Sequence, residues 1–356
     1  MRILFITRKF PPSVGGMEIY SKELYEALKE IGADVHICKP ENPILGRPSV
    51  FRVGIFFLSA CWTLLRQRRS FDAVLIGDFC IASLAMVAKA FMPGSVRIAV
   101  ALHGNDLYFM RKRTLLAAIY RWICTVVVAS RSLDAAIANS HAIEQEAFSR
   151  GVRHISVVPL ATRLPDLDVP TSSGRRRTLL FAGRLIRYKG LSWFVNNVLP
   201  SLDPSLELLV AGEVWDESER ICLNSDPRIH YLGPVPYEKL AVLRAQVAAC
   251  IMPNIPPVST EQDEGFGLAA LESPAAGTPV IAAAVGGLPD AVAHGTTGFL
   301  LPPLDAAAWI RCVNDLLTWT PEQYAHFTRT ARAHIAECYN WHLVAHRTVA
   351  VLASHS

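Results

Sequence analysis

Short apolar runs alternate with amphipathic segments along the first half of the chain. The apolar runs predict buried β-strands, and the segments between them, with apolar positions every three or four residues, predict helices. The strands are expected at residues 2–7, 34–38, 73–76, 96–102, 135–138 and 155–158. The helices are expected at residues 16–31, 51–69, 80–92, 115–129 and 140–150. Strands and helices in strict alternation are typical of a parallel sheet covered by helices.

The same alternation begins again after a break in composition. Residues 159–177 are rich in Pro, Asp, Ser, Gly and Arg, which is typical of a connection between domains. Strands then follow at residues 179–182, 206–211, 228–231, 249–252 and 279–283, with helices between and after them. We therefore predict an α/β protein with a Rossmann-like domain over 1–160, a linker over 161–177, a second Rossmann-like domain over 178–338, and a helical segment over 339–356 that is long enough to cross back to the first domain.

Composition narrows the class of protein. Of the 356 residues, 51% are hydrophobic and 19% are charged, so the chain is globular and builds sizeable cores. The net charge of +4 is too small for a nucleic-acid-binding surface, and no nucleic acid partner is expected. The eight cysteines form no CxxC pair, which is typical of thiols in a reducing compartment. No secretory segment or bilayer span is recognisable, so we expect a cytoplasmic protein, with the inner face of the membrane as an alternative location.

A glycine pair follows the first predicted strand. Gly15 and Gly16 lie at the start of the first helix, where backbone amides could bind a phosphate group. The loop lacks the G-x-G-x-x-G pattern and contains Pro11-Pro12, so a nicotinamide cofactor is disfavoured.

Polar residues also follow later strands. His103 and Asp106 come directly after the strand at 96–102, at the end where open parallel sheets bind ligands. The alternative is that His103 is a hydrogen-bonded structural group. Arg184 and Lys189 follow the first strand of the second domain and could hold a diphosphate, Arg184 by its fork and Lys189 as a point charge. The alternative there is a solvated basic loop.

The segment Glu264-Gly-Phe-Gly-Leu-Ala-Ala-Leu-Glu272 combines glycines with two carboxylates eight positions apart. Gly265 and Gly267 allow backbone to approach a ligand closely, and the amides that open the following helix could bind an anion. Each glutamate could hold a different pair of hydroxyls on a phosphorylated sugar. The alternative is a pair of ordinary glutamates, one favoured by the helix dipole and one exposed.

These motifs together resemble the retaining glycosyltransferases of family 4, which have the GT-B architecture of two Rossmann-like doubly wound domains facing a central cleft. The specific part of the resemblance is the segment Glu264–Glu272, followed by Ala276-Gly-Thr-Pro-Val280 and Gly286-Gly-Leu-Pro-Asp290. The glycine pair, His103-Gly104, Gly183-Arg184 with Lys189-Gly190, and a closing segment similar to the family's crossover helix add to it.

The resemblance implies a role for each candidate residue. A nucleotide-diphosphate sugar would lie mainly on the second domain, and the first domain would bind the acceptor. Arg184 and Lys189 match the diphosphate-binding pair, and Gly16, next to Gly15, matches the loop that closes on the phosphates. Glu264 would face the donor sugar and Glu272 would hold the ribose. The other donor-binding positions that the resemblance implies are Val235 at the base and Gly265, Phe266, Gly267 and Leu268 at the sugar and phosphate.

For the reaction, the resemblance implies transfer of a hexose with retention to a hydroxyl of a glycan or lipid-linked acceptor. His103 matches a histidine near the reacting centre, and Asp106 is an acceptor-side candidate. Arg184 and Lys189 could stabilise the departing diphosphate, and no Asp-x-Asp motif stands at a strand end, so we expect no metal and no other cofactor. A nucleotide-sugar epimerase of the same architecture and a catalytically silent sugar-binding homologue are the alternatives. The sequence leaves open whether the base is uracil or guanine.

One helix raises the question of a membrane. Residues 51–65 are apolar and are followed by Arg66, Arg68 and Arg69, as in a helix that lies on an anionic membrane surface. Arg111-Lys112-Arg113 and Arg121-Trp122 could supplement it. The alternative is a helix that covers the sheet and ends in a solvated basic turn.

Overall fold

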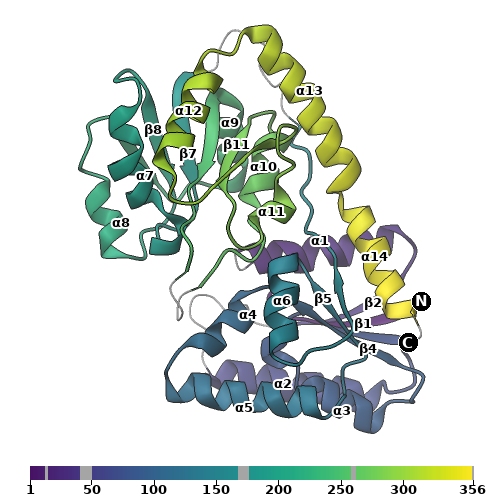
Figure 1. Cartoon of the computed structure of the whole chain (residues 1–356). Coiled ribbons are helices and arrows are strands. Elements are labelled where there is room, and N and C mark those ends of the chain that lie inside the picture. Colours follow the sequence, from purple (N-terminus) through teal and green to yellow (C-terminus); the bar gives the residue numbers. More distant parts are fainter. Residues whose placement is uncertain (13–14, 41–49, 167–175, 258–261, 355–356) are drawn as a thin grey trace. The chain divides into compact units, whose positions relative to one another are not determined.

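The structure is a computed structural model that describes residues 1–12, 15–40, 50–166, 176–257 and 262–354. The chain divides into two compact units, each with one parallel sheet (Figure 1). The first unit comprises Met1–Leu160, Ser259–Gly265 and Trp341–Ser356. The second unit comprises Ala161–Val258 and Phe266–Asn340.

The first unit is built on a six-stranded parallel sheet with the order β2-β1-β3-β4-β5-β6. Its strands are β1 (Arg2–Ile6), β2 (Asp34–Cys38), β3 (Ala73–Ile76), β4 (Arg97–Leu102), β5 (Ala135–Ala138) and β6 (Ile155–Val157). All four residues of β3 and of β5 are buried, as expected for strands covered on both faces. In this sheet β2 lies on one side of β1, whereas β3 and all later strands lie on the other side. The strand order therefore reverses between β1 and β3.

Helices cover both faces of this sheet. The helices of the unit are α1 (Gly16–Glu30), α2 (Val50–Arg66), α3 (Leu84–Phe91), α4 (Asn105–Tyr108), α5 (Leu115–Ala129), α6 (His141–Ser149) and α14 (Trp341–Ala353), with 3-10 turns η1 (Phe79–Ile81) and η2 (Phe109–Arg111). Apolar side chains of α2, α3 and α5 join one core cluster with one side of the strands, whereas α14 packs beside α1 and against β4 and β5 (Figure 1). The C-terminal helix is thus an integral part of the first unit.

The second unit repeats the plan with the order β12-β11-β10-β7-β8-β9. Its strands are β7 (Arg176–Ala182), β8 (Glu207–Ala211), β9 (Ile229–Gly233), β10 (Val247–Met252), β11 (Val280–Ala283) and β12 (Gly298–Leu301). Its helices are α7 (Leu191–Asn197), α8 (Glu217–Cys222), α9 (Tyr237–Gln246), α10 (Ala269–Ala275), α11 (Leu288–Ala291), α12 (Ala306–Leu317) and α13 (Pro321–Cys338), with 3-10 turns η3 (Arg187–Lys189) and η4 (Leu199–Ser201). Here the strand order reverses between β7 and β10.

The predicted fold class, two Rossmann-like units with a C-terminal helix against α1, is confirmed. Several short elements differ from the prediction. The predicted helix at 80–92 is the turn η1 followed by the shorter α3. The strand β12 was not anticipated, because its sequence GFLL begins with a glycine and gives only three large apolar residues in a row. The helix α8 was not anticipated, because six residues are too short to produce a recognisable helical period.

Candidate active site

The point where the strand order of the first sheet reverses carries a buried ion pair. Arg8 follows β1, Asp78 follows β3, and the Arg8 Nε atom lies 3.0 Å from Asp78 Oδ2. Asp78 is fully buried, and its Oδ1 atom also accepts a hydrogen bond of 2.9 Å from the amide of Cys80. Ligands of open parallel sheets bind at such a reversal, outside the carboxyl ends of the strands. The ion pair therefore joins the carboxyl ends of β1 and β3, which border this candidate ligand site.

His103 lies at the next strand end, directly after β4. Its Nε2 atom is 3.0 Å from the carbonyl oxygen of Gly77. A carbonyl oxygen only accepts hydrogen bonds, so Nε2 carries a proton and is the donor of this pair. The ring of Tyr20 from α1 stands edge-on to the imidazole with 4.5 Å between the centroids. The orientation of the half-buried His103 ring is therefore set by β3 and α1.

Asp106 supports the same loop from inside the unit. The side chain is only 2% exposed, and it accepts hydrogen bonds from the backbone amides of Phe79, His103 and Leu107 at 3.1, 3.2 and 3.1 Å. Burial raises the pKa of its carboxyl group, and the charge of Asp78 adds to the rise, while His103 opposes it. Because Asp106 accepts hydrogen bonds from three backbone amides, it holds the turns after β3 and β4 together.

The segment that contains Glu264 belongs to the first unit and lies against the loops after β4 and β5. Ser140, which caps α6, donates a hydrogen bond of 2.7 Å from Oγ to the carbonyl of Gly265. A Cβ atom at Gly265 would lie 2.7 Å from the carbonyl oxygen of His103, so only glycine fits this approach. Glu264 is 9% exposed. The structure thus brings the two predicted catalytic residues, His103 and Glu264, to the same end of one sheet.

A second carboxylate adjoins Glu264. Asp263 accepts a hydrogen bond of 2.7 Å from the amide of Glu264 through Oδ1. Burial raises the pKa of Asp263, and the nearby charges of Glu264 and Glu146 raise it further, while Arg111 and the amide hydrogen bond oppose the rise. Asp263 therefore shapes the backbone turn that presents Glu264.

The glycine pair stands at the start of α1, which begins at Gly16. Gly15 is half-buried and Gly16 is exposed. Glu18 in the first turn of α1 is paired with Lys9, whose Nζ atom lies 3.0 Å from Glu18 Oε1. The lysine after β1 thus neutralises the carboxylate nearest to this helix start.

In the second unit, the tip of β7 presents the predicted cationic pair. The guanidinium of Arg184 lies over the ring of Trp215, with 4.8 Å from Cζ to the centroid, and Nη2 donates to the hydroxyl of Tyr188 at 3.2 Å. The Lys189 ammonium lies 5.7 Å from the centre of the Tyr188 ring. Arg184 and Lys189 are half-buried, whereas Arg187 in the same loop is exposed. Arg184 and Lys189 are therefore positioned by aromatic rings at the reversal between β7 and β10.

Gly190 joins this loop to α7 in a conformation that only glycine tolerates. Its φ angle is +73°, and a Cβ atom would lie 1.9 Å from the carbonyl oxygen of Pro253, which follows β10. The loop with Arg184 and Lys189 is thus packed directly on the backbone after β10.

We predict that Gly190→Ala lowers the free energy of unfolding by about 3 kcal/mol or more, because the left-handed conformation and the overlap with Pro253 both oppose a methyl group. Chemical denaturation measures the change. Gly183→Ala is the matched control, since a Cβ atom there meets nothing within 4 Å. Equal stability of the two variants would contradict this packing.

Glu272 is held by a residue that the sequence did not reveal. It lies in the first turn of α10 and forms an ion pair with Arg244 of α9. The Arg244 side chain is 3% exposed, and that of Glu272 is 13% exposed. A buried arginine that pairs with a carboxylate fixes the position of both groups. A cationic residue on a predicted helix gives no sign that it points inward, so only the packing identifies Arg244.

The remaining donor-binding candidates lie in the second unit. Phe266 is 2% exposed, Gly267 has a φ of +89°, and Leu268 precedes α10, which begins only at Ala269. Val235 packs against a small apolar cluster beside β7 and β10. The boundary between the units falls between Gly265 and Phe266, so the two glutamates of the motif belong to different units.

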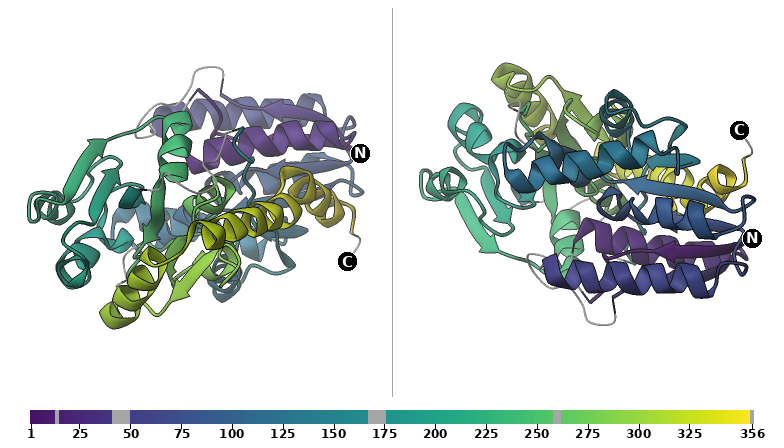
Figure 2. Two further views of the ribbon diagram at one scale, coloured as in Figure 1. Left: turned by 90° about the horizontal axis from the view of Figure 1, so that it is seen from above. Right: turned by 90° about the horizontal axis from the view of Figure 1, so that it is seen from below.

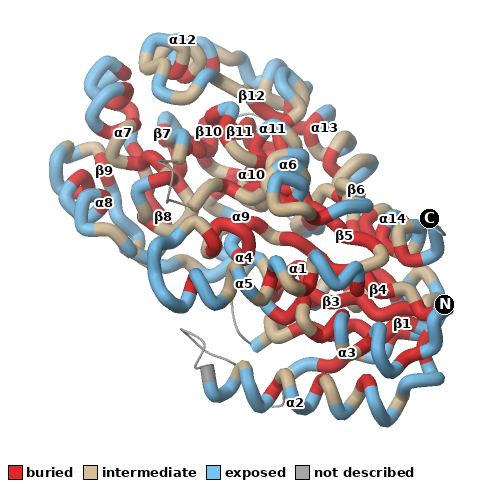
Figure 3. The backbone as a smooth tube through the Cα atoms, turned by 60° about the horizontal axis from the view of Figure 1, so that its bottom comes forward, coloured by how far each residue is buried: buried red, intermediate tan, exposed pale blue. Residues whose placement is uncertain are grey.

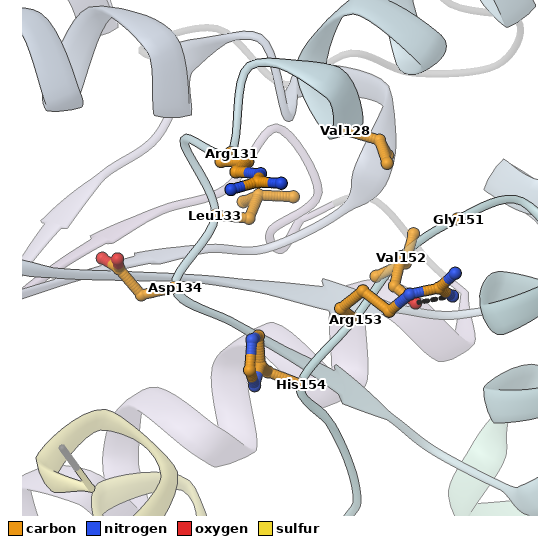
Figure 4. A pocket seen from close by; sticks show the side chains of 8 residues that line it. All are labelled: Val128, Arg131, Leu133, Asp134, Gly151, Val152, Arg153 and His154. Atoms are coloured by element: carbon orange, nitrogen blue, oxygen red, sulfur yellow. Dashed lines mark hydrogen bonds between the residues drawn. The ribbon is translucent and has the colours of Figure 1, made fainter. Parts of the chain in front are cut away.

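A hollow of about 540 Å³ lies elsewhere in the first unit, at the amino ends of β5 and β6 (Figure 4). It is lined by Arg131, Asp134, Arg153 and His154 among others. None of the predicted site residues lines it. Within the described ranges, no group of three or more His, Cys, Asp or Glu side chains could hold a metal ion, and no helix is long and apolar enough to cross a bilayer.

Each half of the chain matches a family profile. Residues 14–164 match the profile described as Glycosyltransferase Family 4, and residues 176–318 match the profile described as Glycosyl transferases group 1. The chain is 27% identical over 403 aligned residues to the glycogen synthase of Mycobacterium tuberculosis, with 99% of this chain and 94% of that protein covered.

Two further similar proteins differ in sequence identity and in how much of this chain they cover. The D-inositol 3-phosphate glycosyltransferase of Streptomyces avermitilis is 42% identical over 123 residues, which are 35% of this chain but only 25% of that protein. The crystal structure of HepE from Anabaena in complex with UDP and glucose superposes with a TM-score of 0.71 at 17% identity and covers all of both chains.

The strand orders, the residues at the strand ends and these matches define a glycosyltransferase of the GT-B class. The chain belongs to the retaining glycosyltransferases of group 1, family 4, which transfer sugars from nucleotide-sugar donors.

Proposed function

We propose that this enzyme transfers a hexose, with retention of configuration, from a UDP- or GDP-sugar to a hydroxyl of a glycan or lipid-linked acceptor, without a metal ion. The observation that carries the proposal is the pair Arg184 and Lys189, two half-buried cations oriented by Trp215 and Tyr188 at the end of β7. Two fixed positive charges stabilise a departing diphosphate, which is the work a metal ion does in other transferases.

In this proposal the donor is recognised by several elements. Glu272, fixed by Arg244, binds the ribose hydroxyls, and the backbone near Val235 contacts the base. The amides of Gly265, Phe266, Gly267 and Leu268 bind the sugar and the phosphates. On the first unit, the Gly15-Gly16 backbone supplies further donors to the phosphates. Uridine diphosphate is supported as the leaving group by the relative HepE, which was crystallised with UDP-glucose.

Glu264 and His103 act on the sugar that is transferred. Glu264 orients the sugar hydroxyls and stabilises positive charge at the anomeric carbon, and the departing phosphate takes the proton of the acceptor. His103 donates through Nε2 to Gly77, so its other ring nitrogen is the one that remains to contact the sugar. Asp106 acts on the acceptor side through the loop that carries His103, since its carboxylate serves three backbone amides.

The test is a thermal-shift panel of UDP-, GDP- and ADP-sugars, followed by an assay of free nucleotide diphosphate. A donor at about one hundred times its dissociation constant is expected to stabilise the native state by about 2.7 kcal/mol, which raises the melting temperature by several degrees. The same donor should release its nucleotide diphosphate, faster with acceptor present. Stabilisation with epimerisation of the sugar and no release would identify an epimerase, and no stabilisation by any sugar nucleotide would contradict the proposal.

A further inference from the structure

The helix α2 carries two apolar faces. Phe56, Ala60 and Leu64 point into the core of the first unit and are at most 3% exposed. On the opposite side, apolar residues recur at spacings of four and three and form the outer stripe of α2. Its members are Phe51, Ile55, Leu58, Trp62 and Leu65, and they are 39–75% exposed. At 100° per residue the centres of the two stripes lie about half a turn apart, and α2 is drawn largely in the exposed colour (Figure 3).

The helix α5 repeats this arrangement. Ala117, Cys124 and Val127 are buried in the same core cluster or beside it. An outer stripe of α5, defined by Leu115, Leu116, Ile119 and Trp122, is 48–79% exposed. A sheet-covering helix needs one apolar face, so packing within this chain accounts for the inner residues of α2 and α5 but not for the outer stripes.

The outer stripes belong to one side of the molecule. In a parallel sheet with right-handed connections, the helices that follow β2, β3 and β4 cover the same face. This places α2, α3 and α5 together, as the shared core cluster and the view from below confirm (Figure 2). The short helix α3 adjoins α2 and adds the exposed Met86 and Phe91. The outer stripes and these two residues form what we call the outer face of the first unit.

The two segments that carry the outer stripes have charges of one sign. Residues 50–69 and 109–131 contain nine of the 35 basic residues of the chain and none of its 31 acidic residues, so the rest of the chain is net negative. Arg66, Arg68 and Arg69 are exposed at the end of α2, and Lys112 and Arg113 are exposed before α5. Positive charge is therefore concentrated beside exposed aromatic and aliphatic side chains, which is the composition of an interfacial membrane-binding surface.

We propose that the outer face docks on an anionic lipid bilayer, with Trp62 and Trp122 in the headgroup region and the flanking basic residues against the lipid charges. A second copy of the chain is the other candidate for such a face. It would bring the same arginines and lysines opposite one another with no carboxylate between them in either segment, which opposes association. Docking on lipid goes beyond the proposed sugar transfer and would bring the enzyme to acceptors held in a membrane.

The test measures vesicle binding without donor or acceptor, so its result does not depend on whether transfer occurs. The purified chain is sedimented with vesicles of phosphatidylcholine alone or mixed with phosphatidylglycerol. We expect binding that requires phosphatidylglycerol and weakens with salt. Trp62→Ser/Trp122→Ser and Arg66→Gln/Arg68→Gln/Arg69→Gln should each weaken it about tenfold or more, since each basic residue and each buried apolar side chain adds to membrane affinity.

Matched controls separate this surface from general stickiness. Ile221→Ser removes an apolar side chain that is 68% exposed on α8, and Arg311→Gln/Arg329→Gln/Arg347→Gln removes three exposed charges elsewhere. Both should bind as the parent chain does. Equal binding to uncharged vesicles, an unchanged affinity of the Trp62→Ser/Trp122→Ser variant, or no binding at all would overturn the proposal.

A second measurement guards against misfolding of the serine variant. Lipids with brominated acyl chains should quench the tryptophan fluorescence of the parent chain, and quenching should fall in Trp62→Phe/Trp122→Phe, which retains an aromatic ring at each position. Light scattering in solution should show the same oligomeric state for the parent chain and for these variants. A dimer that dissociates in Trp62→Ser/Trp122→Ser would assign the outer face to a second copy and contradict docking on lipid.

Discussion

Glu264→Gln is expected to lower kcat for sugar transfer about a hundredfold or more while leaving the affinity for free nucleotide diphosphate unchanged. The side chain is buried in a loop fixed by Ser140 and by the carbonyl of His103, so its charge acts from a defined place. A preorganised carboxylate is worth more to the positively charged transition state than to the neutral ground state. Glutamine keeps the shape and the hydrogen-bonding oxygen but removes this charge. Initial rates of nucleotide diphosphate release measure kcat.

The neighbouring carboxylate provides the control for Glu264. Asp263→Asn removes the half-buried carboxylate next to Glu264, yet the amide oxygen of asparagine can still accept the hydrogen bond from the amide of Glu264. We expect it to retain a kcat close to that of the parent enzyme. If Glu264→Gln turns over at the parent rate, or if both variants lose activity equally, the assignment of the transition-state charge to Glu264 is wrong.

The sequence predicted most of the fold because most strands are continuous apolar runs with polar ends. Ala73–Ile76 and Ala135–Ala138 were predicted with their observed bounds, since each is buried on both faces and bounded by polar or turn residues. The helix Leu115–Ala129 was also predicted to the residue. In contrast, β12 begins with a glycine, and its pairing with β11 rather than its own composition makes it a strand.

The candidate site was predictable where residues follow strands directly in the sequence. His103, Arg184 and Lys189 come just after β4 and β7, so their position at the sheet edge follows from topology. Partners that join distant segments were not predictable. Arg8 with Asp78 and Arg244 with Glu272 are separated by 70 and 28 residues, and a single sequence contains no sign of such pairings.

The structure also changes how the glutamate motif is understood. From the sequence, Glu264 to Glu272 formed one continuous ligand-binding segment that opened a helix. In the structure the part of this segment that belongs to the first unit ends at Gly265, and α10 starts four residues later. The two glutamates are consequently held by different surroundings, Glu264 by the loops after β4 and β5, and Glu272 by Arg244 on α9.

Replacing Arg184 and Lys189 together by glutamine should lower kcat/KM for the donor about a thousandfold. Removal of one group that stabilises transition-state charge typically costs about a hundred- to a thousandfold in kcat, and here two such groups act on the same leaving group. The two substitutions should weaken contacts to the diphosphate of the donor and leave contacts to its base unchanged. Affinity for the nucleotide diphosphate should fall strongly, whereas affinity for the corresponding nucleoside should not change. Calorimetric titration of the two ligands measures this difference.

Arg187 is a third cation in the same loop, so its substitution tests whether the position of a charge matters or only the net charge of the loop. Its side chain is exposed, whereas Arg184 lies over Trp215 and Lys189 over Tyr188. A solvated charge is screened, so Arg187→Gln should change kcat/KM by less than about threefold. Arg184→Lys should restore only part of the activity, since lysine cannot stack as a planar group or bind two phosphate oxygens at once. A large effect of Arg187→Gln, or full activity of Arg184→Lys, would show that net charge alone governs the loop and that the aromatic rings do not direct it.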